Sequence, residues 1–139
     1  GWGLDASLEL EKDLALVMDI HHHWIRAEEY IQPHDDRVKR VIDSWRGQRP
    51  TMHYSYSRDE HLAPANLGDK IHSEMHDIKM LLERGCKKQK LRAHSDLLPN
   101  TKVNDWALSF GEHFDIQTEA KGKNMAAEQL YRQHIEKNV

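Results

Sequence analysis

The chain lacks the features that mark disulfide-rich, membrane-spanning or repetitive proteins. Its 139 residues include a single cysteine, Cys86, which excludes an internal disulfide and favours a reducing compartment. No apolar run approaches the roughly 18 residues that a membrane span requires, and the first residues do not follow the basic-then-apolar order of a secretory signal. There is no internal repeat or low-complexity tract. These absences predict one cytoplasmic domain without a membrane span.

The motifs of the best-marked enzyme classes are also missing. There is no glycine-rich phosphate loop, no GxSxG elbow, no CxxC pair, no HExxH and no EF-hand loop. Cys86 lies among Arg84, Lys87 and Lys88, a setting that lowers the pKa of an exposed thiol. A lone cysteine is more often a small apolar residue in a turn, and this is the interpretation we prefer. The sequence therefore favours a binding protein over an enzyme.

Helical periodicity is the strongest pattern that the sequence does contain. Apolar residues make up only 38% of the chain, and its mean hydropathy is -0.85. These apolar residues nevertheless recur at regular spacings. In residues 66–84 they follow each other at four, four, three and four positions, as Leu67, Ile71, Met75, Ile78 and Leu82. Gly85 follows as a natural helix stop. The pattern predicts a long helix over 66–84 around which the rest of the chain is organised.

We expect the remaining segments to form an all-α fold, an irregular bundle of five to six helices in a single domain over residues 1–139, with no significant sheet. Apolar spacing, caps and breakers place these helices at approximately 6–31, 35–46, 66–84, 87–98, 102–120 and 125–137. Between 47 and 63 the helical period is lost, and Met52, Tyr54 and Tyr56 alternate with polar residues. This period-two fragment is too isolated to make a sheet, so residues 47–63 are predicted to be a long loop.

Charge is segregated along the chain although the net charge is only -3. Residues 1–36 carry nine acidic side chains against two basic ones, whereas residues 84–92 carry five basic side chains and no acidic one. Such a basic segment attracts an acidic protein surface or the phosphates of a nucleic acid, and tyrosines nearby can stack on bases. The predicted partner-binding residues are Arg84, Lys87, Lys88, Lys90, Arg92, Tyr54 and Tyr56. The simpler alternative is a solvated charged surface that pairs with neighbouring helices.

Histidine is abundant in this chain, with eleven residues. An i, i+4 pair on one helix face can chelate a transition metal, and helical bundles build iron and zinc sites from histidine and glutamate. The candidate ligands are His21, Glu28, His72, His76 and His134. The alternative is that these are surface histidines together with one or two hydrogen-bonded core histidines.

Two short stretches resemble a known family of helical metalloproteins. HHHWIRAEEYIQP is similar to the His, Glu-Glu and Pro stretch of hemerythrin-like di-iron bundles, and EHFDIQTE is similar to their later His-Phe helix. The resemblance implies a helical bundle that binds iron or oxygen. The residue four before Glu28 is Trp24, where that pattern has a histidine.

Taken together, these patterns leave two functions open. The first is a small helical binding or regulatory module without a cofactor, which contacts an anionic partner through residues 84–92 and the loop 47–63. The second is a hemerythrin-like helical bundle that holds iron or zinc through core-facing histidine and glutamate. The oligomeric state is left open.

Overall fold

The computed structural model describes residues 3–7, 14–119 and 130–136. The elements, in chain order, are α1 (Leu4–Ser7), β1 (Met18–Asp19), α2 (Ile20–Ala27), α3 (Asp36–Ser44), β2 (Thr51–Tyr54), α4 (Asp59–Leu62), η2 (Ala63–Ala65), η3 (Gly68–Lys70), α5 (Ile78–Glu83), α6 (Lys88–Leu91), α7 (Thr101–Leu108) and β3 (Asp115–Thr118). Residues 130–136 are also helical. The fold is mixed α/β, so the expectation of an all-α bundle without a sheet is wrong.

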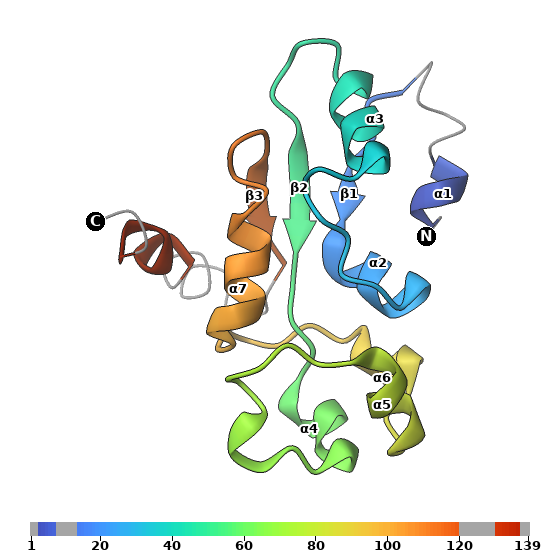
Figure 1. The fold of residues 1–139 in the computed structure, drawn as a ribbon, viewed down its shortest axis with the longest axis vertical. Coiled ribbons are helices and arrows are strands. Elements are labelled where there is room, and N and C mark those ends of the chain that lie inside the picture. Colours follow the sequence, from blue (N-terminus) through green and yellow to red (C-terminus); the bar gives the residue numbers. More distant parts are fainter. Residues whose placement is uncertain (1–2, 8–13, 120–129, 137–139) are drawn as a thin grey trace.

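A parallel three-stranded sheet lies at the centre of the fold, with β2 between β1 and β3 (Figure 1). Met52 and Tyr54 in β2 are fully buried, while the alternate residues Thr51 and His53 are half-buried. The prediction of a long loop over 47–63 is therefore wrong. Its alternating residues do form a strand, but β1 has only two residues and β3 lies within a predicted helix, so neither partner strand is visible in the sequence.

The predicted helix over 66–84 is also wrong in most of its length. Only α5 at its end is α-helical, and residues 68–70 form a single 3-10 turn. Side chains from other elements bind the backbone in between: Tyr56 Oη donates to Ile71 O at 2.9 Å, Asn100 Nδ2 to Glu74 O at 2.8 Å, and Tyr30 Oη to His76 O at 2.9 Å. These tertiary hydrogen bonds satisfy carbonyl groups that an α-helix would otherwise use.

The first long predicted helix, 6–31, is divided into α1, β1 and α2, with residues 8–13 outside the described part. Asp19 begins α2 because its side chain accepts a hydrogen bond from the His22 backbone N–H, as an N-cap does. Glu28 ends α2 in a left-handed conformation, at φ 60. The short strand β1 therefore passes directly into a helix, a junction that helical periodicity alone does not reveal.

The other predicted helices are shorter than expected, and one contains a strand. α3 lies inside the predicted range 35–46, and α6 fills four residues of 87–98. The range 102–120 contains α7 and then β3, because the chain turns after Leu108 and becomes extended. The helical residues 130–136 lie inside 125–137, whose other residues are outside the described part. None of the described helices has the length and hydropathy to cross a bilayer.

One hydrophobic core joins the buried face of the sheet to the helices around it. Met18, Met52 and Tyr54 contribute from the strands, and Ile25 and Val41 are completely buried beside them. α4, α5 and α6 gather beyond the carboxyl end of β2 (lower part of Figure 1). The sheet thus has one face in the core and its carboxyl edge next to the α2 and α6 region.

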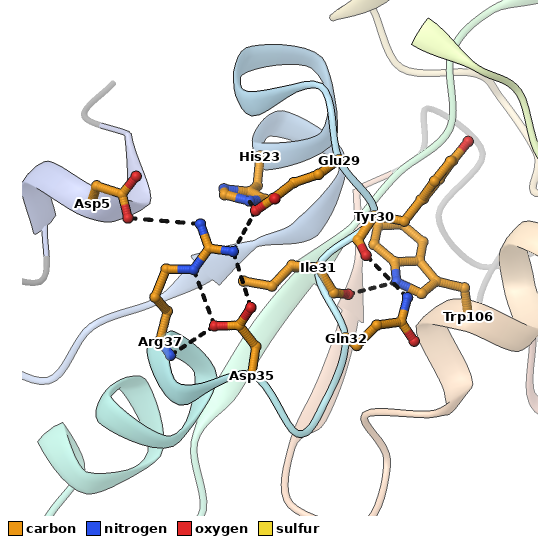
Figure 2. Close-up of polar contacts among 9 residues, drawn as sticks. All are labelled: Asp5, His23, Glu29, Tyr30, Ile31, Gln32, Asp35, Arg37 and Trp106. Atoms are coloured by element: carbon orange, nitrogen blue, oxygen red, sulfur yellow. Dashed lines mark hydrogen bonds and ion pairs between the residues drawn. The ribbon is translucent and has the colours of Figure 1, made fainter.

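A cluster of charged side chains joins α1, α2 and α3 (Figure 2). His23 Nε2 lies 2.8 Å from Glu29 Oε1, and Arg37 pairs with Glu29, with Asp35 at 3.0 Å and with Asp5 at 3.8 Å. The His23 hydrogen bond and the Arg37 guanidinium lower the pKa of Glu29. Because its acids and bases pair with one another, we interpret this cluster as a link between helices.

Candidate metal centre

Three potential metal ligands meet at the carboxyl edge of the sheet. Asp19 is the last residue of β1, His53 is in β2, and Glu119 directly follows β3. Asp19 pairs with His53 in the parallel register, and His53 pairs with Gln117, two residues before Glu119. Because side chains alternate between the two faces of a strand, Asp19, His53 and Glu119 project from the same face. The carboxyl ends of parallel strands are where α/β proteins bind their ligands.

The distances within this cluster are close to those expected around a single ion. One ligand atom each from Asp19, His53 and Glu119 lies within 4.8 Å of the other two, and all three residues are half-buried. His53 Nδ1 is 2.9 Å from Glu119 Oε1, yet this oxygen has no hydrogen-bond partner among the described residues. This contact is an ion pair when His53 is protonated, and a bound cation would take the place of that proton.

His22 is a further candidate ligand on the first turn of α2, outside the group of three whose ligand atoms lie within 4.8 Å of one another. Its Nε2 atom is shielded from solvent and has no hydrogen-bond partner in the described part of the chain. A buried nitrogen of this kind is unfavourable unless it binds a proton donor or a metal. Burial lowers the pKa of His22, Asp19 opposes this shift, and Arg92 and Arg26 lower the pKa further. The lowered pKa favours the neutral form of the ring, which a metal ligand requires.

Asp19 has two roles at this edge. Its Oδ1 atom accepts the His22 backbone N–H at 2.8 Å and so caps α2. Burial raises the pKa of Asp19 and the adjacent Glu119 carboxyl raises it further, against the opposing His22 hydrogen bond. Two carboxylates held together in a partly buried place repel each other, and a bound cation relieves this repulsion.

The five ligands predicted from the sequence do not form a site. Among the described residues, the Asp19 cluster is the one group of three or more His, Cys, Asp or Glu side chains close enough to share an ion. His21 is buried, and both of its ring nitrogens contact serine hydroxyls. Glu28 pairs with Lys88 at 3.3 Å. Burial lowers the pKa of His21 to about 3, so it is a neutral core histidine.

The other predicted histidines lie elsewhere. His72 Nε2 is 3.0 Å from Asp59 Oδ1, beside a surface hollow of about 400 Å³. His76 is buried, and its Nε2 atom is 2.8 Å from Ile71 O. His134 is exposed in the helical residues 130–136. The fold also differs from the all-α bundle that the hemerythrin-like resemblance implies, since a parallel sheet lies at its centre.

Some of the predicted partner-binding residues are exposed, and others contact neighbouring residues of the chain. Lys87, Lys90 and Arg92 are exposed, whereas Lys88 is partly covered by its contact with Glu28. Arg84 is exposed, and its Nη1 atom donates to Ala65 O at 3.0 Å.

The two tyrosines and the cysteine of the sequence predictions are all buried. Tyr54 and Tyr56 are 0% and 4% exposed, so in this structure neither ring is open for the predicted stacking on a base. Cys86 is buried, and burial raises the pKa of its thiol, contrary to an activated nucleophile.

Asp19, His22, His53 and Glu119 are not among the ligands predicted from the sequence, because each is recognised only once the sheet is known. β1 ends in Asp19, β2 contains His53 and Glu119 follows β3, but neither β1 nor β3 has a strand pattern that would mark its residue in the sequence. No family model, curated protein or solved structure matches this chain, so the geometry of the site is the basis for its function.

Proposed function

We propose that the protein binds a divalent transition-metal ion through Asp19, His53 and Glu119 and uses it to hydrolyse an anionic ester. The observation that carries the proposal is the convergence of these three ligand atoms, within 4.8 Å of one another, at the carboxyl edge of a parallel sheet. His22 is the proposed fourth ligand, because its unpaired Nε2 lies on the first turn after Asp19. This arrangement places the metal function on the sheet and not in a helical core.

The donor set favours particular ions. Two imidazoles with two carboxylates suit Zn²⁺, Mn²⁺ or Fe²⁺, whereas Mg²⁺ and Ca²⁺ prefer oxygen ligands alone. Zinc binds nitrogen and oxygen at about 2.0 to 2.2 Å, so ligands on one ion lie at most about 4.4 Å apart. The upper limit of 4.8 Å in this cluster is close to that span, and small side-chain rotations would close the difference.

Such an ion would lower the pKa of a water molecule and polarise the oxygen of a carbonyl or phosphoryl group. The protein's own residues would fix its position. Asp19 is held by the N-terminus of α2, His53 by the central strand, and Glu119 by the hydrogen bond from its backbone N–H to Tyr54 O at 2.8 Å. Ligands on three adjacent strands and one helix turn give a rigid, preorganised site.

Positive charge near the site favours an anionic substrate. Arg92 and Arg26 are close enough to lower the pKa of His22, and Arg92 ends the basic segment 84–92. The attraction for an anionic partner that the sequence predicts would therefore act beside the metal ligands. A phosphate ester is the substrate class that a metal ion and two guanidinium groups would bind together.

Metal titration tests the binding part of the proposal. Untagged protein, stripped with a chelator, is titrated calorimetrically with Zn²⁺ and with Mn²⁺. We expect one tight site in the wild type and its loss in His53→Ala and in Glu119→Gln. His113→Ala is the matched control, since this exposed histidine precedes β3 at the opposite end of the sheet. Equal binding by all four proteins would contradict the site.

Hydrolysis of a chromogenic phosphodiester by the metal-loaded protein tests the chemical part. We expect Arg92→Glu to raise KM with a smaller change in kcat, because it removes attraction that acts on the bound substrate and the transition state alike. Lys39→Glu on α3 makes the same charge change away from the carboxyl edge and should leave the rate unchanged. A metal-loaded protein without phosphodiesterase or esterase activity would restrict the function to metal binding.

A further inference from the structure

His21 lies next to the proposed ligand His22 but points into the protein. It is 5% exposed, and it contacts two serines that follow β2. His21 Nε2 is 3.0 Å from Ser57 Oγ, and His21 Nδ1 is 3.0 Å from Ser55 Oγ. Both serines are buried as well, at 2% and 0% exposed. A ring that uses both nitrogens inside the core has a defined orientation.

The hydrogen-bond directions follow from a third contact. Ser57 Oγ donates its proton to Leu91 O at 2.7 Å, so towards His21 it can only accept. His21 must then carry its proton on Nε2. In a neutral imidazole this leaves a lone pair on Nδ1, which accepts the hydroxyl proton of Ser55. The chain of donors and acceptors has a single consistent solution, with His21 as the Nε2–H tautomer.

This chain of hydrogen bonds joins three segments of the protein, one of which carries the proposed ligand His22. His21 belongs to the first turn of α2, the serines to the segment after β2, and Leu91 to the end of α6. The residue after His21 is His22, and the residue after Leu91 is Arg92. Movement of the imidazole would therefore displace a proposed ligand and a proposed substrate-binding cation together.

We infer that His21, fixed as its Nε2–H tautomer by Ser55 and Ser57, is a positioning residue that sets the directions of His22 and Arg92 at the metal centre. The inference rests on the proposed metal function. An imidazole suits this place because it donates from one edge of a rigid ring and accepts at the other. Partners that hydrogen-bond a metal ligand directly typically contribute 10- to 100-fold to metal affinity, and we expect an effect of this order from His21, which acts through the backbone that it shares with His22.

The tautomer can be measured directly by NMR correlation of the ring nitrogens with their attached protons at neutral pH. We expect His21 to be protonated on Nε2 in the wild type. In Ser57→Ala the acceptor for that proton is lost, so the Nδ1–H form that donates to Ser55 should become populated. A wild-type His21 ring protonated on Nδ1 would overturn the inferred tautomer.

Metal affinity tests the positioning role. His21→Phe keeps a ring but loses both hydrogen bonds, and it should weaken Zn²⁺ binding about 10- to 100-fold. His21→Gln keeps a donor near the Nε2 position and should retain most of the affinity. His76→Gln is the control, because it also alters a buried, hydrogen-bonded histidine, outside the Asp19 cluster. Its Zn²⁺ affinity should equal that of the wild type even where its melting temperature falls.

The possible failures are distinguishable. A wild type that binds no Zn²⁺ or Mn²⁺ would contradict the proposed function, and the inference with it. A wild type that binds the ion while folded His21→Phe binds it equally well would contradict the positioning role alone. If His21→Phe does not fold, Ser55→Ala and Ser57→Ala can be used instead, because each removes one of the two hydrogen bonds to the His21 ring. Unchanged affinity in both would then overturn the inference.

Discussion

Replacing Asp19 with asparagine would separate the metal site from the helix cap that the same side chain provides. Asparagine is as good an N-cap as aspartate, so the hydrogen bond from the His22 backbone N–H should persist. The substitution removes one of the two adjacent carboxylates and one metal ligand. We therefore expect Asp19→Asn to stabilise the metal-free protein and to abolish its stabilisation by metal.

The size of the effect follows from the spacing of the charges. Two unit charges at the 4.8 Å limit of the cluster repel by about 0.9 kcal/mol in water and about 3.5 kcal/mol at an effective dielectric constant of 20. Because the carboxylates of Asp19 and Glu119 are half-buried, we expect a gain of roughly 1 to 3 kcal/mol. For a chain of this size each kcal/mol raises the melting temperature by roughly 4 °C.

Thermal melts followed by circular dichroism, with chelator and then with Zn²⁺ or Mn²⁺, measure both effects. At a free metal concentration of about 100 times Kd, the wild type should gain about 2.7 kcal/mol while Asp19→Asn gains nothing. Asp77→Asn is the matched control, an exposed N-cap whose Oδ1 accepts the Lys79 N–H at 3.0 Å. It should change stability by only about 0.5 kcal/mol and keep the metal response.

Two results would refute this reasoning. A metal-free Asp19→Asn protein less stable than the wild type would mean that the two carboxylates do not repel each other in the folded state. An equal gain from metal in Asp19→Asn and in the wild type would mean that the ion binds elsewhere, for example at exposed histidines.

Three further predictions test the fold. Tyr54→Phe should cost about 1 to 3 kcal/mol in urea denaturation, because the buried Tyr54 hydroxyl donates to Asn104 Oδ1 at 2.7 Å and its loss leaves that oxygen unpaired. Ile78→Asp, at a side chain 2% exposed, should cost several kcal/mol, and a stable, cooperatively melting variant would contradict this. Burial lowers the pKa of His76, so the unfolded state binds this proton first as pH falls below about 6.5. As the pH is lowered, this group should reduce the free energy of unfolding by up to about 1.4 kcal/mol per pH unit. His76→Gln should remove this contribution to the pH dependence.

Part of the local structure could be predicted from the sequence. Val38 and Val41, one turn apart, predict the amphipathic helix that the structure has at α3, and Asp35 caps it as its position before the apolar pattern suggests. The period-two pattern of residues 52–56 marks the buried side chains of β2 correctly. These features depend on residues close together in the chain, where backbone geometry and side-chain spacing are sufficient.

Tertiary contacts decided the rest. The segment before α5 has helical spacing but is drawn into an irregular path by Tyr30, Tyr56 and Asn100, which lie far away in the sequence. The sheet needed partners with no recognisable strand pattern, one of them only two residues long.

The metal centre depends most on tertiary structure. By themselves Asp19, His53 and Glu119 are three ordinary polar residues, separated by 34 and 66 positions in the sequence. Local spacing determined which segments could be buried, whereas the parallel register of three strands determined which side chains met, because only strand pairing places residues so distant in the chain on one face.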